Sequence, residues 1–262
     1  MTALRSAFGD SARLPAGVGA WMSTRSGGCS AAPYDGLNLG DHVGDEPAHV
    51  QANRALLART LGAEPVFMQQ VHGQAVVGLH SAHAPTPMAD ACWSEQPGLA
   101  CTVLVADCLP VLLWDVQARW VAAAHAGWRG LAGEAGVGVL EALWQALQRR
   151  GARAAETRVW LGPCIGPQAF EVGPEVRTAF GADGPAVAAA FRPGPGDRLL
   201  ADLPALARWR LQCMDLVQIG GNDGTPAHCT VTQSALFFSH RRDTLRLGGS
   251  GRMAACIWLD RR

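Results

Sequence analysis

The stretch PVLLWDVQARWVAAAHAGWRG, residues 110–130, decides the fold class. It contains two apolar runs, 110–114 and 120–124, whose branched, aromatic and aliphatic residues predict two strands. Only a few residues separate the two runs, which is too short for the helical crossover that joins parallel strands. The pattern therefore favours an α+β fold over a doubly wound parallel sheet.

Further strands and helices are predicted on both sides of this stretch. Several of the apolar runs have apolar residues at successive positions, so both faces of the sheets should be covered. The other predicted strands are 100–104, 158–161, 216–219 and 253–259. Helical spacing predicts one helix from an Asp45 cap to Leu61, one that includes Val137 and Leu147, and one over 202–213.

The composition is that of an ordinary globular chain and excludes several mechanisms. The 262 residues are 48% hydrophobic and 17% charged, and we interpret residues 1–262 as a single domain. Acidic and basic residues number 22 each, so no global field favours nucleic acid or an anionic membrane. All the basic residues are Arg. The lack of Lys excludes a Schiff base, a pyridoxal phosphate anchor and a Walker loop, and leaves anion binding to Arg and backbone amides.

The eight Cys residues are scattered, and none forms a Cys-x-x-Cys pair, which excludes a zinc ribbon and a thioredoxin-like motif. Residues 1–19 have no continuous apolar segment typical of a signal peptide, and no run of about 18 apolar residues occurs. We therefore expect a cytoplasmic protein with reduced thiols and no membrane partner. A secreted protein with paired Cys is the alternative.

Three polar residues interrupt apolar segments: His72, Cys108 and His125. Two nitrogen ligands and one sulfur ligand suit zinc, and three protein ligands leave a fourth position open. The gaps between the three residues match no local metal motif, however. A buried Cys with two hydrogen-bonded core His residues, or a Cys108 nucleophile with His125 as its base, are the alternatives.

Arg residues near Gly or hydroxyl groups are the candidates for binding an anion. Arg129 follows His125 in a turn with three Gly residues, just before a predicted helix. Arg25 lies in the segment TRSGG, and Arg241 and Arg242 lie in the segment FFSHRRD. Arg25, Arg241 and Arg242 could bind phosphate in a bidentate manner, or form a structural ion pair with a carboxylate such as Asp243. For Arg129 the alternative is a solvated side chain on a flexible Gly turn.

Taken together, these segments resemble the YfiH-type family, also called laccase-domain or polyphenol oxidase proteins and, more recently, purine nucleoside phosphorylases and peptidoglycan editing factors. The matching pieces extend over nearly the whole chain. They are TRxGGxS (24–30), LNLG (37–40), VGD (43–45), NR (53–54), QVHG (70–73), ADCLPV (106–111), HAGWRG (125–130), GPxI (162–165), EVG (171–173) and FSxRR (238–242).

This resemblance implies an α/β/β/α sandwich in which His72, Cys108 and His125 bind a catalytic zinc ion. The implied reactions are the phosphorolysis of adenosine, inosine, guanosine and 5'-methylthioadenosine, and the deamination of adenosine. Purine nucleosides and phosphate are then the partners. The chain departs from the family pattern at Cys29, Glu134 and Phe170, the last in place of a common Tyr.

With no Lys, phosphate is expected to be held by Arg25, Arg129, Arg241 or Arg242, of which Arg129 is preferred. Deamination also requires a general acid, and the signature of the zinc cytidine deaminases is absent. The acid stays open among Asp107, Glu171 and His240. We place Gln70, Asp107 and Glu171 around the metal ligands as supporting residues.

Two other enzymes and a scaffold remain as alternatives. A copper polyphenol oxidase, with Cu²⁺ in place of zinc, requires clustered His residues, whereas the eight His residues here are dispersed. A metal-free hydrolase with a Cys108–His125 pair could act on a peptidoglycan precursor. A non-catalytic scaffold would tolerate the loss of Cys108.

Overall fold

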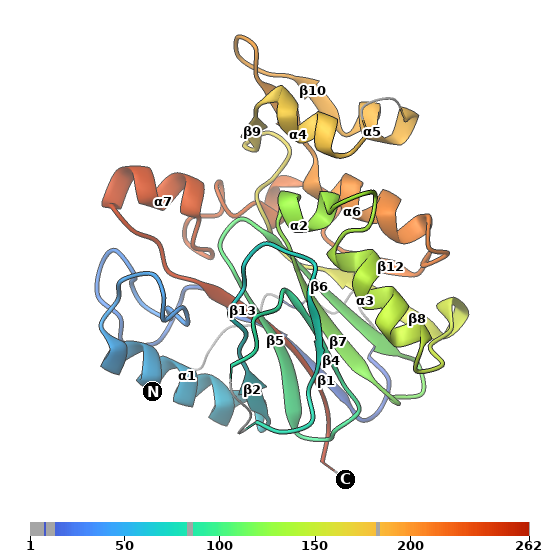
Figure 1. Ribbon diagram of the computed structural model, residues 1–262. Helices are drawn as coiled ribbons and strands as arrows, with labels where there is room; N and C mark the ends of the chain where they lie inside the picture. The colour runs from blue at the N-terminus through green and yellow to red at the C-terminus, as the bar shows by residue number, and fades with distance from the viewer. Residues whose placement is uncertain (1–7, 9–13, 83–85, 182–183, 262) are drawn as a thin grey trace.

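Two mixed β-sheets form the centre of the molecule (Figure 1). The computed structural model describes residues 8, 14–82, 86–181 and 184–261. One sheet has the order β1 (Val18–Met22), β13 (Met253–Leu259), β5 (Leu99–Val105), β2 (Glu64–Val66). The other has the order β12 (Ile219–Gly221), β8 (Thr157–Leu161), β6 (Leu109–Asp115), β7 (Val121–Ala126), β4 (Ala91–Ser94), β3 (Val76–Gly78).

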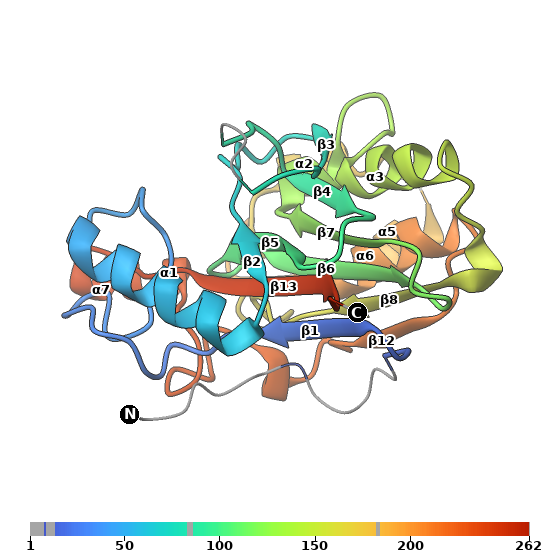
Figure 2. The ribbon, with the colours of Figure 1, turned by 90° about the horizontal axis from the view of Figure 1, so that it is seen from below.

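Helices cover the outer faces of both sheets, as Figure 2 shows, with α1 on one side and α3 and α6 on the other. A small third sheet, β10 (Phe191–Pro193), β11 (Leu199–Ala201) and β9 (Glu171–Val172), lies beyond the six-stranded sheet. The helices are α1 (Pro47–Leu61), α2 (Trp128–Ala132), α3 (Val139–Gln148), α4 (Pro174–Ala179), α5 (Pro185–Ala189), α6 (Leu203–Gln212) and α7 (His240–Leu247).

The alternation of side chains along the central strands explains the layers. In β7, Val121 and Ala123 pack between the sheets, whereas Ala122 and Ala124 face α3 and α6. A strand with both faces buried reads as a continuous apolar run, because its successive side chains point to opposite faces. The predicted α+β fold and α/β/β/α layering are confirmed.

The hairpin predicted from residues 110–130 is present. Strands β6 and β7 pair in antiparallel fashion, with Leu109 opposite Ala126 and Trp114 opposite Val121. This pairing brings the residue before β6 close to the last residues of β7. The edge of the sheet at this end therefore collects side chains from two segments that are separate in sequence.

Several predicted boundaries were wrong. Glu46, not Asp45, precedes α1, because the Asp45 carboxylate accepts hydrogen bonds from Ser30 Oγ and Asn38 Nδ2 instead. The strand predicted at 216–219 runs over Ile219–Gly221, and α3 begins after Val137. Helix α2 was not predicted. The extent of the domain, 1–262, stays a prediction, because parts of that range lie outside the described residues.

The third predicted helix is confirmed as α6, and Asp202 caps it by accepting a hydrogen bond from the Ala205 amide. Among the helices in the described ranges, none combines the length and the apolar character needed to cross a bilayer.

Candidate metal centre

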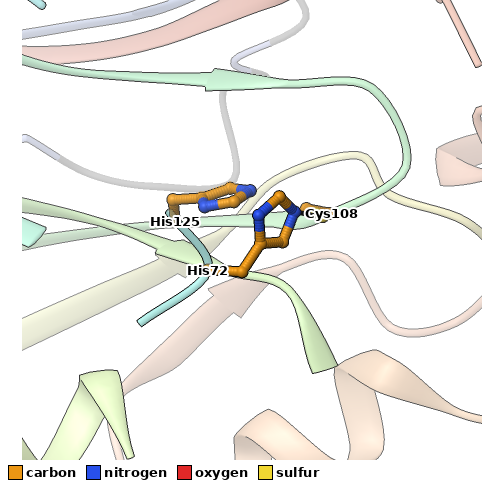
Figure 3. Close-up of side chains that lie close together, drawn as sticks. All are labelled: His72, Cys108 and His125. Carbon is orange, nitrogen blue, oxygen red and sulfur yellow. Dashed lines mark hydrogen bonds between the residues drawn. The ribbon is translucent and has the colours of Figure 1, made fainter. Parts of the chain in front are cut away.

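His72, Cys108 and His125 converge at one edge of the stacked sheets (Figure 3). Cys108 lies in the turn between β5 and β6, and His125 lies near the end of β7. His72 comes from the loop that follows β2. The β6–β7 pairing places Cys108 and His125 together, and the loop adds the third side chain.

The three side chains have the spacing of a metal site. Their donor atoms all lie within 4.8 Å of one another, and Cys108 Sγ is 3.7 Å from His72 Nε2. Bonds of about 2.3 Å to sulfur and about 2.0 Å to nitrogen in a tetrahedron separate those two ligand atoms by about 3.5 Å. The residues present therefore fit a zinc ion. His125 is buried and His72 is exposed, so the group has one side open.

A buried carboxylate, Asp90, holds both His ligands. Asp90 Oδ1 lies 2.8 Å from His125 Nδ1, which leaves Nε2 of that ring to face a metal. The same carboxylate accepts hydrogen bonds from the amides of Val71, His72 and Gly73 at 3.2, 2.9 and 2.8 Å. Carboxylates that fix the tautomer and orientation of a His ligand are typical of zinc sites.

The backbone around the ligands is bent into uncommon conformations. His72 and Asp107 have φ values of 60° and 84°, in the left-handed region that residues other than Gly rarely adopt. At His72 this turn directs three consecutive amides toward Asp90. Gly127 has a different role, because two ligand side chains lie very close to its backbone. A Cβ at this position would lie 2.9 Å from His72 Cδ2 and 3.0 Å from Cys108 Sγ.

The site favours a thiolate beside a charged imidazole. Burial raises the pKa of Cys108, but the charges and hydrogen bonds of His125 and His72 outweigh it and lower that pKa to about 6. Burial likewise opposes charge on His125, yet Cys108 and Asp90 raise its pKa to about 9. For Asp90, burial is outweighed by hydrogen bonds from His125, Gly73 and Val71, which lower its pKa. A thiolate is the form of Cys that binds metals.

The three residues open onto a cavity of about 330 Å³, a size typical of small-molecule sites. One part of its wall is apolar and aromatic, and another part is basic. The apolar part includes Leu104, Ala106, Trp128, Ile165, Phe170 and Leu203. The polar part includes His42, Gln70, Asp107, His240, Arg241 and Arg252 together with the three ligands.

Of the four Arg residues predicted to bind phosphate, Arg241 lines this cavity. Arg129 stacks on the Trp128 ring, 4.4 Å from its centroid, and is not among the residues that line the cavity, so its role in phosphate binding stays a prediction. Arg25 and Arg242 line a different depression. Arg25 donates to the carbonyls of Asp35 and Ser234.

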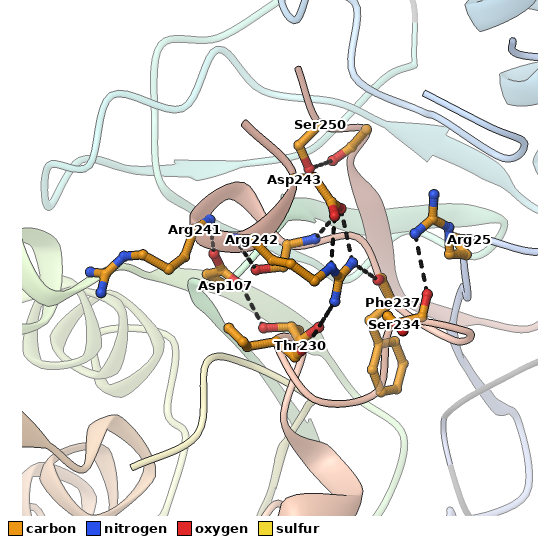
Figure 4. Close-up of polar contacts among 12 residues, drawn as sticks. Arg25, Asp107, Thr230, Ser234, Phe237, Arg241, Arg242, Asp243 and Ser250 are labelled. Carbon is orange, nitrogen blue, oxygen red and sulfur yellow. Dashed lines mark hydrogen bonds and ion pairs between the residues drawn. The ribbon is translucent and has the colours of Figure 1, made fainter. Parts of the chain in front are cut away.

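Arg242 is a structural residue (Figure 4). Its guanidinium donates to the Asp243 carboxylate and to the carbonyls of Thr230, Val231 and Phe237. Arg241, its neighbour in α7, extends in another direction, as the same figure shows, and donates to the carbonyl of Glu171. Arg25 and Arg242 are therefore not retained as phosphate ligands at this site.

The predicted supporting residues have different roles. The Gln70 amide exchanges two hydrogen bonds with the backbone of Leu104, which fixes the loop of His72 against β5. Asp107 lies in the β5–β6 turn, not on a regular strand, and accepts hydrogen bonds from Thr230 Oγ1 and the Arg241 amide. The Glu171 side chain is exposed and is not among the residues that line the cavity, so its supporting role stays a prediction.

Sequence reasoning missed Asp90, Arg252 and His42. Asp90 directly precedes the buried strand β4, and Arg252 directly precedes β13. Both are charged residues that directly border the start of an apolar run, a signal related to that of His125, which interrupts an apolar segment near its end. His42 carries no such signal, because it lies in an irregular loop.

A family model described as multi-copper polyphenol oxidoreductase laccase matches residues 19–260. The chain belongs to this family, the YfiH-type or laccase-domain proteins. Among its relatives is the protein named purine nucleoside phosphorylase YfiH of Escherichia coli K12, 47% identical over 247 residues, which are 94% of this chain and 95% of the relative. The protein named purine nucleoside phosphorylase PA4543 of Pseudomonas aeruginosa is 47% identical over 248 residues, with coverage of 94% and 95%.

Two solved structures share the fold of this chain. The Neisseria meningitidis protein NMB0706 has a TM-score of 0.86 and 40% identity, over 98% of this chain and 99% of the other. YlmD from Geobacillus stearothermophilus has a TM-score of 0.84 and 29% identity, over 98% and 100%. Of the departures from the family pattern, Phe170 lines the cavity, whereas Cys29 and Glu134 do not.

Proposed function

We propose that this laccase-domain protein is a zinc-dependent purine nucleoside phosphorylase. Its substrates are adenosine, inosine, guanosine and 5'-methylthioadenosine together with phosphate, and it also deaminates adenosine. The observation that carries the proposal is the His72–Cys108–His125 group, which opens onto a cavity with aromatic and basic walls. The names of the relatives, purine nucleoside phosphorylases, support the same reaction.

The two kinds of cavity wall suit the two parts of the substrate pair. Trp128 and Phe170 offer flat apolar surfaces for a purine ring, and Ile165 and Leu203 extend that surface. The guanidinium of Arg241, 5.9 Å from the centre of the Phe170 ring, brings positive charge next to it. Apolar groups also exclude water, which would otherwise compete with phosphate for the sugar.

His72, Cys108 and His125 would hold the zinc ion, which supplies a Lewis acid that polarises a bound substrate atom. Asp90 keeps the His125 ring oriented for this role. The reaction also needs a proton for the departing purine. Among the three residues named above as candidate acids for deamination, His240 lines the cavity, Glu171 does not, and both Asp107 oxygens already accept hydrogen bonds. We assign the proton transfer to His240.

The proposal is tested with purified protein, inosine and phosphate, by following hypoxanthine and ribose 1-phosphate. We expect both products in equal amounts, and none without phosphate. Cys108→Ser should abolish product formation and zinc content, whereas the matched control Cys213→Ser, at an exposed position, should change neither. Base release that does not depend on phosphate would contradict the proposal. Metal analysis of the purified protein decides between zinc and the copper that the family description suggests.

A second candidate function is a metal-free Cys108–His125 hydrolase. The lowered pKa of Cys108 and the raised pKa of His125, about 6 and about 9, are those of a nucleophilic thiolate–imidazolium pair. The two candidates differ in the accessibility of the thiol. A zinc-bound thiolate resists alkylation until a chelator removes the metal, whereas a free nucleophile reacts at once.

A further inference from the structure

Arg252 reaches the cavity of the metal centre from the start of β13, and no role was predicted for it. Two backbone hydrogen bonds fix it, because its amide donates to Asn38 Oδ1 at 2.8 Å and its carbonyl accepts from the Leu39 amide at 3.1 Å. Gly40 packs against its aliphatic stem. A Cβ on Gly40 would lie 2.7 Å from Arg252 Cγ. The guanidinium is therefore positioned by packing and not by a salt bridge.

The loop that contacts Arg252 is itself fixed by a buried network. Asn38 Nδ2 donates to the Gly40 carbonyl and to Asp45 Oδ2, and Asn53 Nδ2 donates to the Asn38 carbonyl. These amides are buried, so the hydrogen bonds hold the loop firmly. The loop continues to His42, which lines the same cavity as Arg252. This hydrogen-bonded segment thus places two side chains, Arg252 and His42, at the cavity.

The guanidinium of Arg252 keeps donors available. Its Nη1 donates to the carbonyls of Ser250 and Gly251 at 2.8 and 3.1 Å. Within the described ranges, Nε and Nη2 have no protein acceptor. Arg242 is the opposite case, since Nε, Nη1 and Nη2 all donate to protein oxygens. An Arg with two unused nitrogens presents the fork that binds tetrahedral oxyanions in a bidentate manner.

The charge at this wall is unbalanced. The basic residues at this wall are Arg241, Arg252, His240 and His42. The carboxylate of Asp107 also lines the cavity, but it already accepts hydrogen bonds from Thr230 Oγ1 and the Arg241 amide. Burial and the charge of Arg252 lower the pKa values of His42 and His240, against the opposing effects of Asp41 and Asp107. The positive charge at this wall therefore comes from Arg241 and Arg252, and it would stabilise a bound anion.

We propose that Arg252, with His42 beside it, binds the free phosphate that attacks the nucleoside. The inference rests on the proposed function. A phosphate oxygen forms the bond to C1' of the ribose while the bond from C1' to the purine nitrogen breaks. The electron pair of that bond stays on the purine, which takes up a proton. Arg252 and Cys108 line the same cavity, so the phosphate is held next to the metal centre.

The test uses zinc-loaded protein and three variants. Arg252→Met keeps the stem that packs on Gly40 and removes the donors, and Arg252→Lys keeps a single charge. Arg246→Met is the matched control, because Arg246 is exposed on α7 and lies outside the cavity. Each protein is titrated calorimetrically with inorganic phosphate and with inosine 5'-monophosphate. The KM for phosphate, kcat, zinc content and thermal unfolding midpoint are also measured.

We expect Arg252→Met to raise the dissociation constant and the KM for phosphate at least tenfold, with an intermediate effect in Arg252→Lys and none in Arg246→Met. Zinc content should stay unchanged in all three. Unchanged phosphate binding in Arg252→Met overturns the proposal, as does an effect confined to inosine 5'-monophosphate. If Arg252→Met does not fold, His42→Gln provides the test, and an unchanged phosphate KM in it overturns the proposal. Phosphate binding that depends on Arg252 without formation of ribose 1-phosphate would support the subsite and contradict the phosphorylase function.

Discussion

Replacing Asp90 by Asn should damage both the fold and the metal site, by amounts that follow from its hydrogen bonds. Oδ1 accepts from the His72 amide and lies 2.8 Å from His125 Nδ1, and Oδ2 accepts from the amides of Val71 and Gly73. An Asn side chain has one acceptor oxygen, so whichever way it is oriented, its NH₂ group faces two donors.

A fully buried donor without an acceptor costs about 1–3 kcal/mol, and these hydrogen bonds are only partly buried, so we expect the metal-free variant to lose about 1–3 kcal/mol of unfolding free energy in total. Loss of a carboxylate that orients a His ligand weakens metal binding about 10- to 100-fold. Urea unfolding measures the first effect, and zinc competition against a chromophoric chelator measures the second.

Asp115→Asn is the matched control. Asp115 is also buried, and its carboxylate accepts hydrogen bonds from the Gln117 amide and from the amide and guanidinium of Arg119, at the opposite end of β6. It should lose stability but bind zinc as the parent protein does. Zinc affinity that is unchanged in Asp90→Asn, or reduced equally in both variants, would refute the reasoning.

Three further predictions concern the same region. Gly127→Ala should fold but lose most of its zinc affinity in the chelator assay. The reason is that its Cβ would lie 2.9 Å from His72 Cδ2 and 3.0 Å from Cys108 Sγ. Full zinc affinity in this variant would contradict the prediction, because it would show that these atoms move aside easily. In metal-free protein, iodoacetamide should alkylate Cys108 with a rate that rises around pH 6 and levels off above it, since the pKa of this thiol is lowered to about 6. A midpoint of the rate profile near the ordinary thiol pKa of about 8.5 would contradict the prediction that Cys108 is a thiolate at neutral pH. The same shift has a consequence for stability: the contribution of this thiolate is fully present above its unfolded pKa and is lost as the pH falls through about 6. Arg242→Ala should lose about 3–5 kcal/mol of unfolding free energy in urea, because it leaves the buried Asp243 carboxylate without its cation. The control Arg246→Ala should change the unfolding free energy little. Equal losses in the two variants would contradict the structural role of Arg242.

The sequence predicts those parts of the fold that depend on neighbouring residues. The β6–β7 hairpin follows from a short connection between two apolar runs, and α6 follows from Asp202 and the apolar spacing behind it. The boundary at Asp45 could not be predicted, because its carboxylate is used by Ser30 and Asn38, which the fold brings to it. Local propensity identifies an element, and tertiary contacts decide where it begins.

The candidate site was likewise predictable where it depends on local sequence, and not where it depends on tertiary contacts. His72, Cys108 and His125 could be singled out because each interrupts an apolar segment, and the family resemblance joined them into one group. Asp90 could not be linked to them, since its contact with His125 spans 35 residues and depends on the β4–β7 pairing. The Arg residue that lines the cavity could not be identified from the sequence, because its identification depends on the directions of the side chains. Successive residues of a helix point about 100° apart, so Arg241 reaches the cavity while its neighbour Arg242 does not.

Zinc X-ray absorption of the purified protein shows whether His72, Cys108 and His125 bind zinc. We expect one zinc per chain with one sulfur ligand at about 2.3 Å and nitrogen ligands at about 2.0 Å, and loss of the sulfur signal in Cys108→Ser. A zinc shell without sulfur, or a purified chain that takes up no zinc while His72, Cys108 and His125 are intact, would contradict it.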